Sequence, residues 1–185
     1  MGIQIEDGKG KGVSAEVSSS GMLKVCAVSS SIEHYVNHHY RKAFMTTFET
    51  SASSSDNCVF YIKNTDNIPL IIEGFWIYVD QACDMYMKIN DSGTPTNTTS
   101  VTPINLNTSS GLDAKCDVYK GNDITGLSGG SEFCRFVFIE ETKTEYYNFD
   151  QDLIIGENDT FTIYLDTTAT INFNIPFNFH NGIID

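Results

Sequence analysis

Basic side chains are scarce in this sequence. The 185 residues include 11 Lys and Arg against 24 Asp and Glu, which gives a formal net charge of −13. Nucleic-acid-binding surfaces and proteins that dock on anionic lipid both need clustered Lys and Arg. The closest basic pairs, Lys9/Lys11 and Arg41/Lys42, are both small. We therefore expect neither a nucleic-acid partner nor a membrane partner.

Closely spaced cysteines are also missing. Zinc sites usually contain paired cysteines, and secreted disulfide frameworks usually contain an even number of them. Here the number is odd and the spacing is wide, so we expect reduced and mostly buried thiols in a reducing compartment. The five positions are Cys26, Cys58, Cys83, Cys116 and Cys134.

Long apolar runs are a third absence. No stretch approaches the roughly 18–20 apolar residues that cross a bilayer. Met1–Gly12 is polar and has no apolar segment of the signal-peptide type. We therefore expect synthesis in the cytoplasm of the producing cell.

Catalytic and metal-binding patterns are weak. Carboxylate pairs such as Asp150/Asp152 lie at expected strand ends, where acids usually face water. His34 and His38 are four residues apart and would share a face of a short helix that ends near Arg41, with His39 beside them. No third ligand has a fitting spacing. We therefore expect no enzyme activity, no catalytic residue, no cofactor and no metal.

The stretch from Cys58 to Asp80 predicts the core of an antiparallel sheet. Cys58–Lys63 and Leu70–Val79 are rich in apolar, aromatic and β-branched residues, and the second contains the only tryptophan, Trp76. Asn64–Pro69 between them has turn chemistry. The pattern predicts two strands joined either by a hairpin turn or by a corner between two sheets.

Alternation of apolar and polar side chains predicts further strands. In Thr170–His180, Ile and Phe occupy every second position, and Pro176, which lacks an amide donor, predicts a sheet edge or a bulge. Asp91–Thr102 and Lys120–Ser131 are rich in Gly, Ser, Thr and Asn and predict loops. The other expected strands are Met22–Val28, Ala43–Thr50, Ala82–Ile89, Ala114–Tyr119, Glu132–Glu140, and a hairpin of Leu153–Ile155 with Phe161–Asp166.

These strands predict an all-β fold, an antiparallel β-sandwich or jelly-roll-like domain over residues 21–185. Met1–Ser20 is polar and glycine-rich, and its few apolar side chains cannot form a core. We expect it to be an extended N-terminal arm that lies along a partner. The arm residues expected to bind that partner are Ile3, Ile5, Glu6, Asp7, Gly8, Gly10 and Gly12.

The order of several segments resembles a group of small structural proteins from tailed bacteriophages. The similar segments are IQIEDGKGKG, AEV, GMLKVCAV, FYIKNTDNIPLII, PINLNTSSG, VYKGNDITGLSGG and LIIGENDTFTIYLDTTATINFNIPFNFH. The resemblance implies a virion component that is made in the host cytoplasm and assembles without chemistry. Its implied partners are the major capsid protein or a neck or tail protein. Further copies of the chain, in a homo-oligomer, are also expected because virion parts are commonly symmetric.

Within that group we expect a capsid decoration protein on the outer surface of the particle. Packaged DNA would repel an acidic protein, which favours the outside of the shell. The alternatives are a neck, tail or fibre component, or a carbohydrate-binding β-sandwich that serves adhesion. Sugar binding would need exposed aromatic side chains, for which Tyr146, Tyr147 and Phe149 are the candidates.

Overall fold

The computed structural model describes residues 16–17, 23–24, 36–141 and 144–179. The chain forms two compact units, Met1–Ser31 and Ile32–Asp185. In the first, β1 (Glu16–Val17) pairs antiparallel with β2 (Leu23–Lys24), which lies within the strand expected at Met22–Val28. The expected arm boundary after Ser20 stays a prediction.

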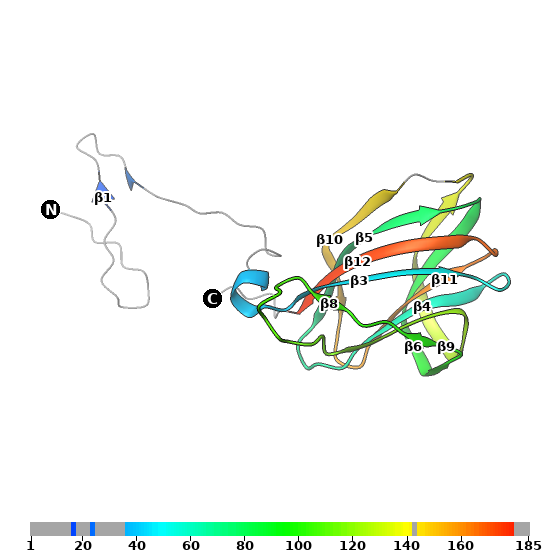
Figure 1. Ribbon diagram of the computed structural model, residues 1–185, viewed down its shortest axis with the longest axis horizontal. Coiled ribbons are helices and arrows are strands. Elements are labelled where there is room, and N and C mark those ends of the chain that lie inside the picture. Colours follow the sequence, from blue (N-terminus) through cyan, green and yellow to red (C-terminus); the bar gives the residue numbers. More distant parts are fainter. Residues whose placement is uncertain (1–15, 18–22, 25–35, 142–143, 180–185) are drawn as a thin grey trace. The chain divides into compact units, whose positions relative to one another are not determined.

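The second unit consists of two five-stranded antiparallel sheets packed face to face (Figure 1). Sheet I has the strand order β10-β5-β12-β3-β8, and sheet II has the order β4-β11-β6-β9-β7. A short π-helical segment, η1, precedes the sheets, within the range where a helical turn was expected. The bounds are η1 Val36–Tyr40, β3 Ala43–Ser51, β4 Asn57–Asn64, β5 Leu70–Val79, β6 Cys83–Thr96, β7 Thr99–Ser100, β8 Ile104–Asn105, β9 Cys116–Phe138, β10 Glu145–Ile155, β11 Thr160–Leu165 and β12 Thr170–Phe179.

The connections identify this sandwich as a jelly roll. Apart from the β6–β9 pair, successive long strands alternate between the two sheets, so that β10-β5-β12-β3 faces β4-β11-β6-β9. This interlocked order is that of two Greek keys, and it confirms the expected fold class. Asn64–Pro69 is therefore a corner between sheets, because β4 lies in sheet II and β5 in sheet I. For the same reason β10 and β11 are not the hairpin that the sequence predicted.

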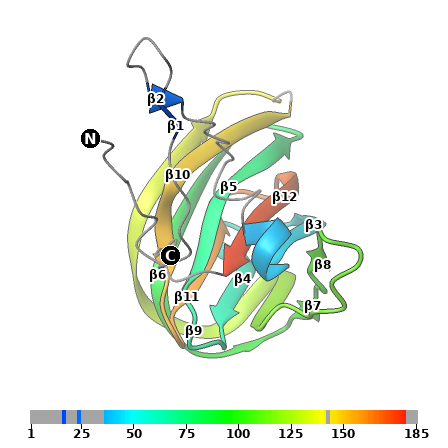
Figure 2. The same cartoon turned by 90° about the vertical axis from the view of Figure 1, so that its left-hand side faces the viewer.

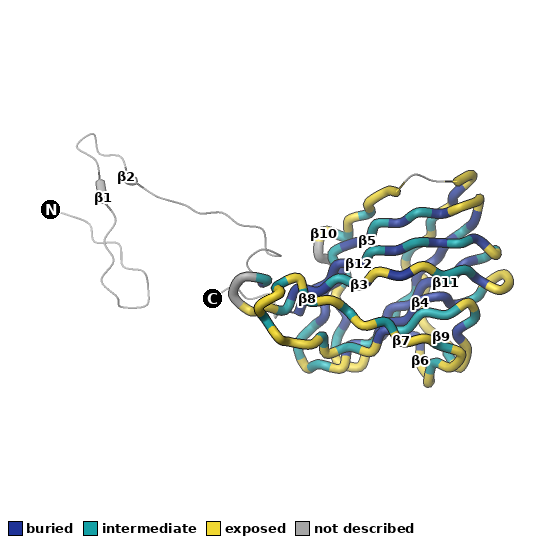
Figure 3. The backbone as a smooth tube through the Cα atoms, viewed as in Figure 1, coloured by how far each residue is buried: buried dark blue, intermediate teal, exposed yellow. Residues whose placement is uncertain are grey.

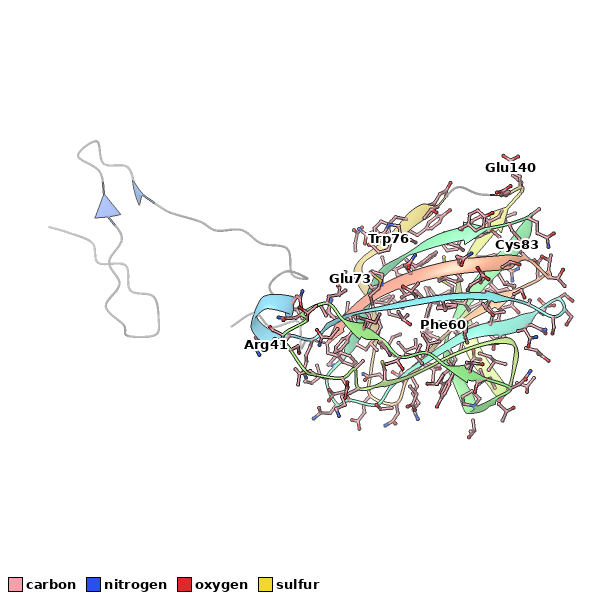
Figure 4. All side chains as sticks on the ribbon, in the orientation of Figure 1. Arg41, Phe60, Glu73, Trp76, Cys83 and Glu140 are labelled. Carbon is pink, nitrogen blue, oxygen red and sulfur yellow. The ribbon has the colours of Figure 1, made fainter. Side chains whose placement is uncertain are left out.

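The core lies between the sheets and is dominated by aromatic and β-branched side chains. Figure 3 shows buried stretches along the strands of both sheets. Phe60 of β4 stacks on Phe48 of β3 at 4.7 Å between ring centroids, which joins sheet II to sheet I. Phe48 also contacts Phe173 of β12, at 5.4 Å. Figure 4 shows Phe60 within the sandwich, where it is fully buried. Rings of this size explain why the Cys58–Asp80 stretch is central to the fold.

Strand β12 is central in sheet I, and its proline lies at a bulge. Pro176 pairs with Met45 of β3, while the register with β5 shifts between Asn174 and Phe177. A proline cannot donate a ladder hydrogen bond, so the break in the β12–β5 ladder is expected at this position. The prediction of an edge or a bulge is confirmed as a bulge.

Two segments that predict loops are instead paired strands. β6 continues to Thr96, and β9 runs without interruption from Cys116 to Phe138 (Figure 2). The first part of β9 pairs with β4 and the second with β6, so the middle of β9 and the distal part of β6 form a two-stranded ribbon. Its glycines, among them Gly93 at φ +113° and Gly126 at φ +81°, adopt backbone angles that other residues rarely reach.

Candidate functional site

A polar hollow of about 780 Å³ lies beside the far end of β3. Glu49, Thr50 and Ser51 of β3 form one wall, and Asn97–Thr99 with Lys120–Asn122 form the facing wall. Every lining residue is polar or glycine. The hollow is therefore of ligand size but offers hydrogen-bonding groups rather than an apolar or aromatic surface.

Two hydrogen bonds tie the walls of this hollow together. Lys120 Nζ donates to the main-chain oxygen of Glu49 at 3.0 Å. The Thr50 hydroxyl donates to the main-chain oxygen of Gly121 at 2.7 Å. Because these bonds join β3 of sheet I to β9 of sheet II, the hollow lies between two sheets that are fixed relative to each other.

The β3 wall of the hollow is an open strand edge. On that side β8 pairs only with Phe44 and Met45. The main-chain oxygens of Ala43 and Glu49 both face away from β12, since they accept from Leu106 N and Lys120 Nζ. Main-chain direction alternates along a strand, so those of Thr47 and Ser51 face the same way. Within the described ranges, no strand pairs with this edge beyond Met45.

A second polar cluster lies on the outer face of sheet II. Tyr86 and Tyr164 stack with centroids 5.0 Å apart, and Lys88 Nζ lies 4.5 Å above the Tyr164 ring. The Arg135 guanidinium lies 4.7 Å from the Tyr86 centroid and donates two 2.8 Å hydrogen bonds to Glu132. Both cations therefore already have partners within the protein, which favours a stabilising role over anion binding.

The Asp91 carboxylate anchors the β6–β9 ribbon to β11. Asp91 is 4% exposed, and its Oδ2 accepts hydrogen bonds from the hydroxyls of Thr162 and Tyr164. The main-chain oxygen of Asp91 accepts a further bond from Thr160 at 2.9 Å. Burial, followed by the charges of Cys58 and Asp91, raises the pKa of Tyr164, so this hydroxyl stays protonated and remains a donor. No local sequence pattern indicates this network, because its members come from two strands that are distant along the chain.

The four described cysteines are free. Cys58 and Cys83 are buried, whereas Cys116 and Cys134 are half-buried, and Cys26 lies outside the described residues. Burial is the main cause that raises the pKa of Cys58 and of Cys116 to about 12 and that of Cys83 to about 11. Thiolate nucleophiles are therefore disfavoured at neutral pH at these three positions.

We expect native protein to resist alkylation at Cys58, because burial shields this thiol and keeps it protonated, and to react slowly at the half-buried Cys116, whose pKa is raised to about 12. A timed pulse of iodoacetamide followed by peptide mass mapping should label Cys134 before Cys58 and Cys116, since its burial is smaller. In denaturant, all sites should react at similar rates. Equal labelling of Cys58 in native and denatured protein would contradict the buried placement.

The expectation that the sequence contains no Gly-x-Ser-x-Gly pattern, the mark of a nucleophile elbow, is wrong, because Gly126–Gly130 reads Gly-Leu-Ser-Gly-Gly. A nucleophile elbow lies on a sharp turn between a strand and a helix. Here the segment belongs to β9, and Ser128 is exposed, with its main-chain oxygen accepting from the Ser92 hydroxyl at 3.0 Å. Ser128 therefore lacks the backbone context of that motif.

The aromatic cluster proposed for sugar binding is divided by the structure. Tyr147 and Phe149 pack on the buried Phe75, with centroids 5.3 and 5.7 Å from it. Tyr146 is exposed and lies against Trp76, with 4.4 Å between ring centroids; Trp76 is labelled in Figure 4. Of the three candidates, Tyr146 alone is exposed, and Tyr147 and Phe149 are half-buried.

Apolar side chains are exposed on β10, an edge strand of sheet I, and on the last part of β9, which among the described strands pairs with β6 alone. Val137 is 64% exposed, Ile154 is 58% exposed and Ile139, just beyond the end of β9, is 83% exposed. Exposed apolar groups on a strand edge are typical of surfaces that are covered in an assembly.

The expected arm residues Ile3, Ile5, Glu6, Asp7, Gly8, Gly10 and Gly12 lie outside the described residues. His34 also lies outside them, and the side chains of His38 and His39 are not described. Among the described side chains, no group of three or more His, Cys, Asp and Glu is placed to hold a metal ion. The described part of the chain also contains no helix with the length and hydrophobicity to span a bilayer.

Comparison with known proteins identifies no relative of this chain. No protein-family profile, curated protein or solved structure matches the chain. The jelly roll, its open edges and its charge are therefore the features that bear on function.

Proposed function

We propose that this chain is a non-enzymatic structural protein of a tailed-phage virion, and that it decorates the outer surface of the capsid. The observation that carries the proposal is the jelly roll with open, partly apolar strand edges. Jelly rolls form many viral capsid and lectin domains. Because a fold alone does not define a function, the edges and the charge must supply the rest of the argument.

The edges supply surfaces for assembly. β9 and β10 carry exposed aliphatic side chains, and β3 has an unpaired stretch beside the polar hollow. A chain that acts by assembly needs such surfaces, whereas it needs no enclosed site for a reacting substrate. The order of segments that resembles tailed-phage structural proteins supports the same assignment.

The charge favours the outside of a particle. A net charge of −13 on 185 residues would be repelled by packaged DNA. The capsid exterior, with the major capsid protein as partner, is consistent with this charge. A neck, tail or fibre position satisfies the same condition and is the alternative within the virion.

The direct test is the protein content of virions of the phage that encodes the chain. Density-gradient purification followed by quantitative mass spectrometry should detect this protein at many copies per particle. Immunogold labelling should then mark the capsid surface. Labelling of the neck or tail would show that the protein is a neck or tail component and not a capsid decoration protein. Absence from washed particles would overturn the virion assignment.

Glycan binding is a second candidate function, supported by the outward Trp76–Tyr146 pair. Stacked aromatic rings on a sheet face can contact the apolar face of a sugar. Because Trp76 is the only tryptophan, host polysaccharide bound there would change the intrinsic fluorescence, and Tyr146→Ala would weaken the response. Unchanged fluorescence in saturating polysaccharide would count against this candidate.

A further inference from the structure

We propose that the open stretch Thr47–Ser51 of β3 accepts an added strand, and that its occupant is the N-terminal segment Ile3–Gly12 of a second copy. This inference rests on the proposed function, because it supplies the contact by which copies join on a particle. Strand addition forms main-chain hydrogen bonds along an exposed sheet edge.

The β3 edge has the groups and the space that strand addition requires. Main-chain groups of Thr47, Glu49 and Ser51 face away from β12, and β8 stops at Met45. The hollow beside them has a volume of about 780 Å³ and lies between this edge and β9. An added chain would continue sheet I in line with β8, and the Lys120 ammonium, which now binds the Glu49 main-chain oxygen, would have to move aside for the new strand.

The other open edge of sheet I is less suitable for an added strand. In β10, the register with β5 shifts between Asn148 and Leu153, and Asp150 has a φ of +50°. Bulges of this kind twist an edge away from a regular partner. The Thr47–Ser51 stretch keeps an unbroken register with β12, from Asn174 to Thr170.

Charge favours the chain's own N-terminal segment as the occupant. Residues 36–185 contain 8 Lys and Arg against 20 Asp and Glu, whereas residues 1–12 contain two of each. The neutral segment 1–12 can approach the acidic domain of another copy without electrostatic repulsion. Two acidic domain surfaces that approach each other would repel. Lys9 and Lys11 would project on the same side of an extended chain. The hollow is lined by one acidic residue, Glu49, and one basic residue, Lys120, whose ammonium is already bound to the Glu49 main-chain oxygen.

The composition and length of the segment also fit the edge. Gly8, Gly10 and Gly12 carry no side chain that would hold the backbone away from a neighbouring surface. An extended chain spans at most about 3.3–3.6 Å per residue, so the fifteen residues 1–15, which precede the β1–β2 pair, reach at most about 50–54 Å. That length allows residues 3–12 to contact a neighbouring copy.

Photo-crosslinking of the full-length protein tests the contact directly. A photoreactive phenylalanine analogue replaces Ile5, and isotopically heavy and light proteins are mixed before irradiation. We expect mixed-isotope crosslinks that map to Thr47–Ser51 or to the facing segments of the hollow. Crosslinks confined to one chain, or mixed crosslinks that map to β9 or β10, would overturn the proposal.

A proline at the edge provides a second test in the full chain. Glu49→Pro removes an amide donor that faces away from β12 and leaves the β3–β12 ladder intact, whereas the matched variant Glu49→Ala keeps the donor. We expect Glu49→Pro to weaken self-association in sedimentation experiments about tenfold relative to Glu49→Ala, as expected for loss of a main-chain hydrogen bond. Equal association of the two folded variants would contradict strand addition here.

The two proposals can fail separately. If the wild-type protein is found in virions but gives no crosslink to the β3 edge, only the strand-addition contact is wrong. If it crosslinks at this edge but is absent from virions, the contact stands and the virion assignment is wrong.

Discussion

Replacing Phe60 with alanine is expected to lower the free energy of unfolding by about 3–5 kcal/mol. Phe60 is fully buried, stacks on Phe48 at 4.7 Å and contacts Phe161 at 6.3 Å. Truncation removes this ring from the centre of the contact between sheets and leaves a cavity that rigid neighbouring strands cannot fill. Equilibrium unfolding in urea, followed by circular dichroism, measures the loss.

Ile139→Ala is the control for the Phe60 variant. Ile139 is 83% exposed, so its truncation should change stability by less than about 0.5 kcal/mol. A loss for Phe60→Ala as small as that of the control would mean that the two sheets do not pack through this ring.

Gly93→Ala is expected to destabilise the β6–β9 ribbon by about 1–3 kcal/mol. Gly93 has a φ of +113°, and a Cβ atom at this position would collide with the main-chain oxygen of Gly126 on the opposite strand. Neither the strain nor the collision is relieved by rotation of a side chain. Hydrogen exchange should show faster amide exchange in residues 91–96 and 125–130 than in β12.

Gly111→Ala separates the collision from the backbone strain. Gly111 also has a positive φ, +62°, but a Cβ atom there would meet nothing within 4 Å. The Gly111→Ala variant should therefore lose less free energy of unfolding than Gly93→Ala, and hydrogen exchange in the ribbon should be unchanged. Equal perturbation of the ribbon by the two variants would contradict the placement of Gly93 against the main-chain oxygen of Gly126.

The jelly-roll topology explains which parts of the protein were predictable from local sequence. Ala43–Thr50, Cys58–Lys63 and Leu70–Val79 each lie within a strand of the structure, because a strand with one buried face must alternate in polarity or be strongly apolar. Pro176 marked a bulge because a missing amide donor interrupts one ladder wherever the strand lies.

The paired segments of β6 and β9 show where local pattern fails. Asp91–Thr96 and Lys120–Ser131 contain turn residues and no apolar alternation, yet they pair with each other and with β4. Their ladder pairs join residues from 29 positions apart, at Thr96 and Thr125, to 66 positions apart, at Cys58 and Ile124. The bonds that anchor Asp91 to Thr162 and Tyr164 span 71 and 73 positions. Local propensity carries no information about such partners.

The sequence by itself determined the all-β class, most strand positions, the acidic surface and the composition of the N-terminal segment, because each depends on residue type and short-range periodicity. Only the tertiary structure decided that Asn64–Pro69 changes sheets and that Lys88 and Arg135 have partners within the protein beside the stacked Tyr86 and Tyr164. It also decided that no described strand pairs with β3 beyond Met45 on the β8 side. These features depend on which distant strands lie side by side. That choice is made by the packing of whole sheet faces, which the order of residues along one strand does not encode.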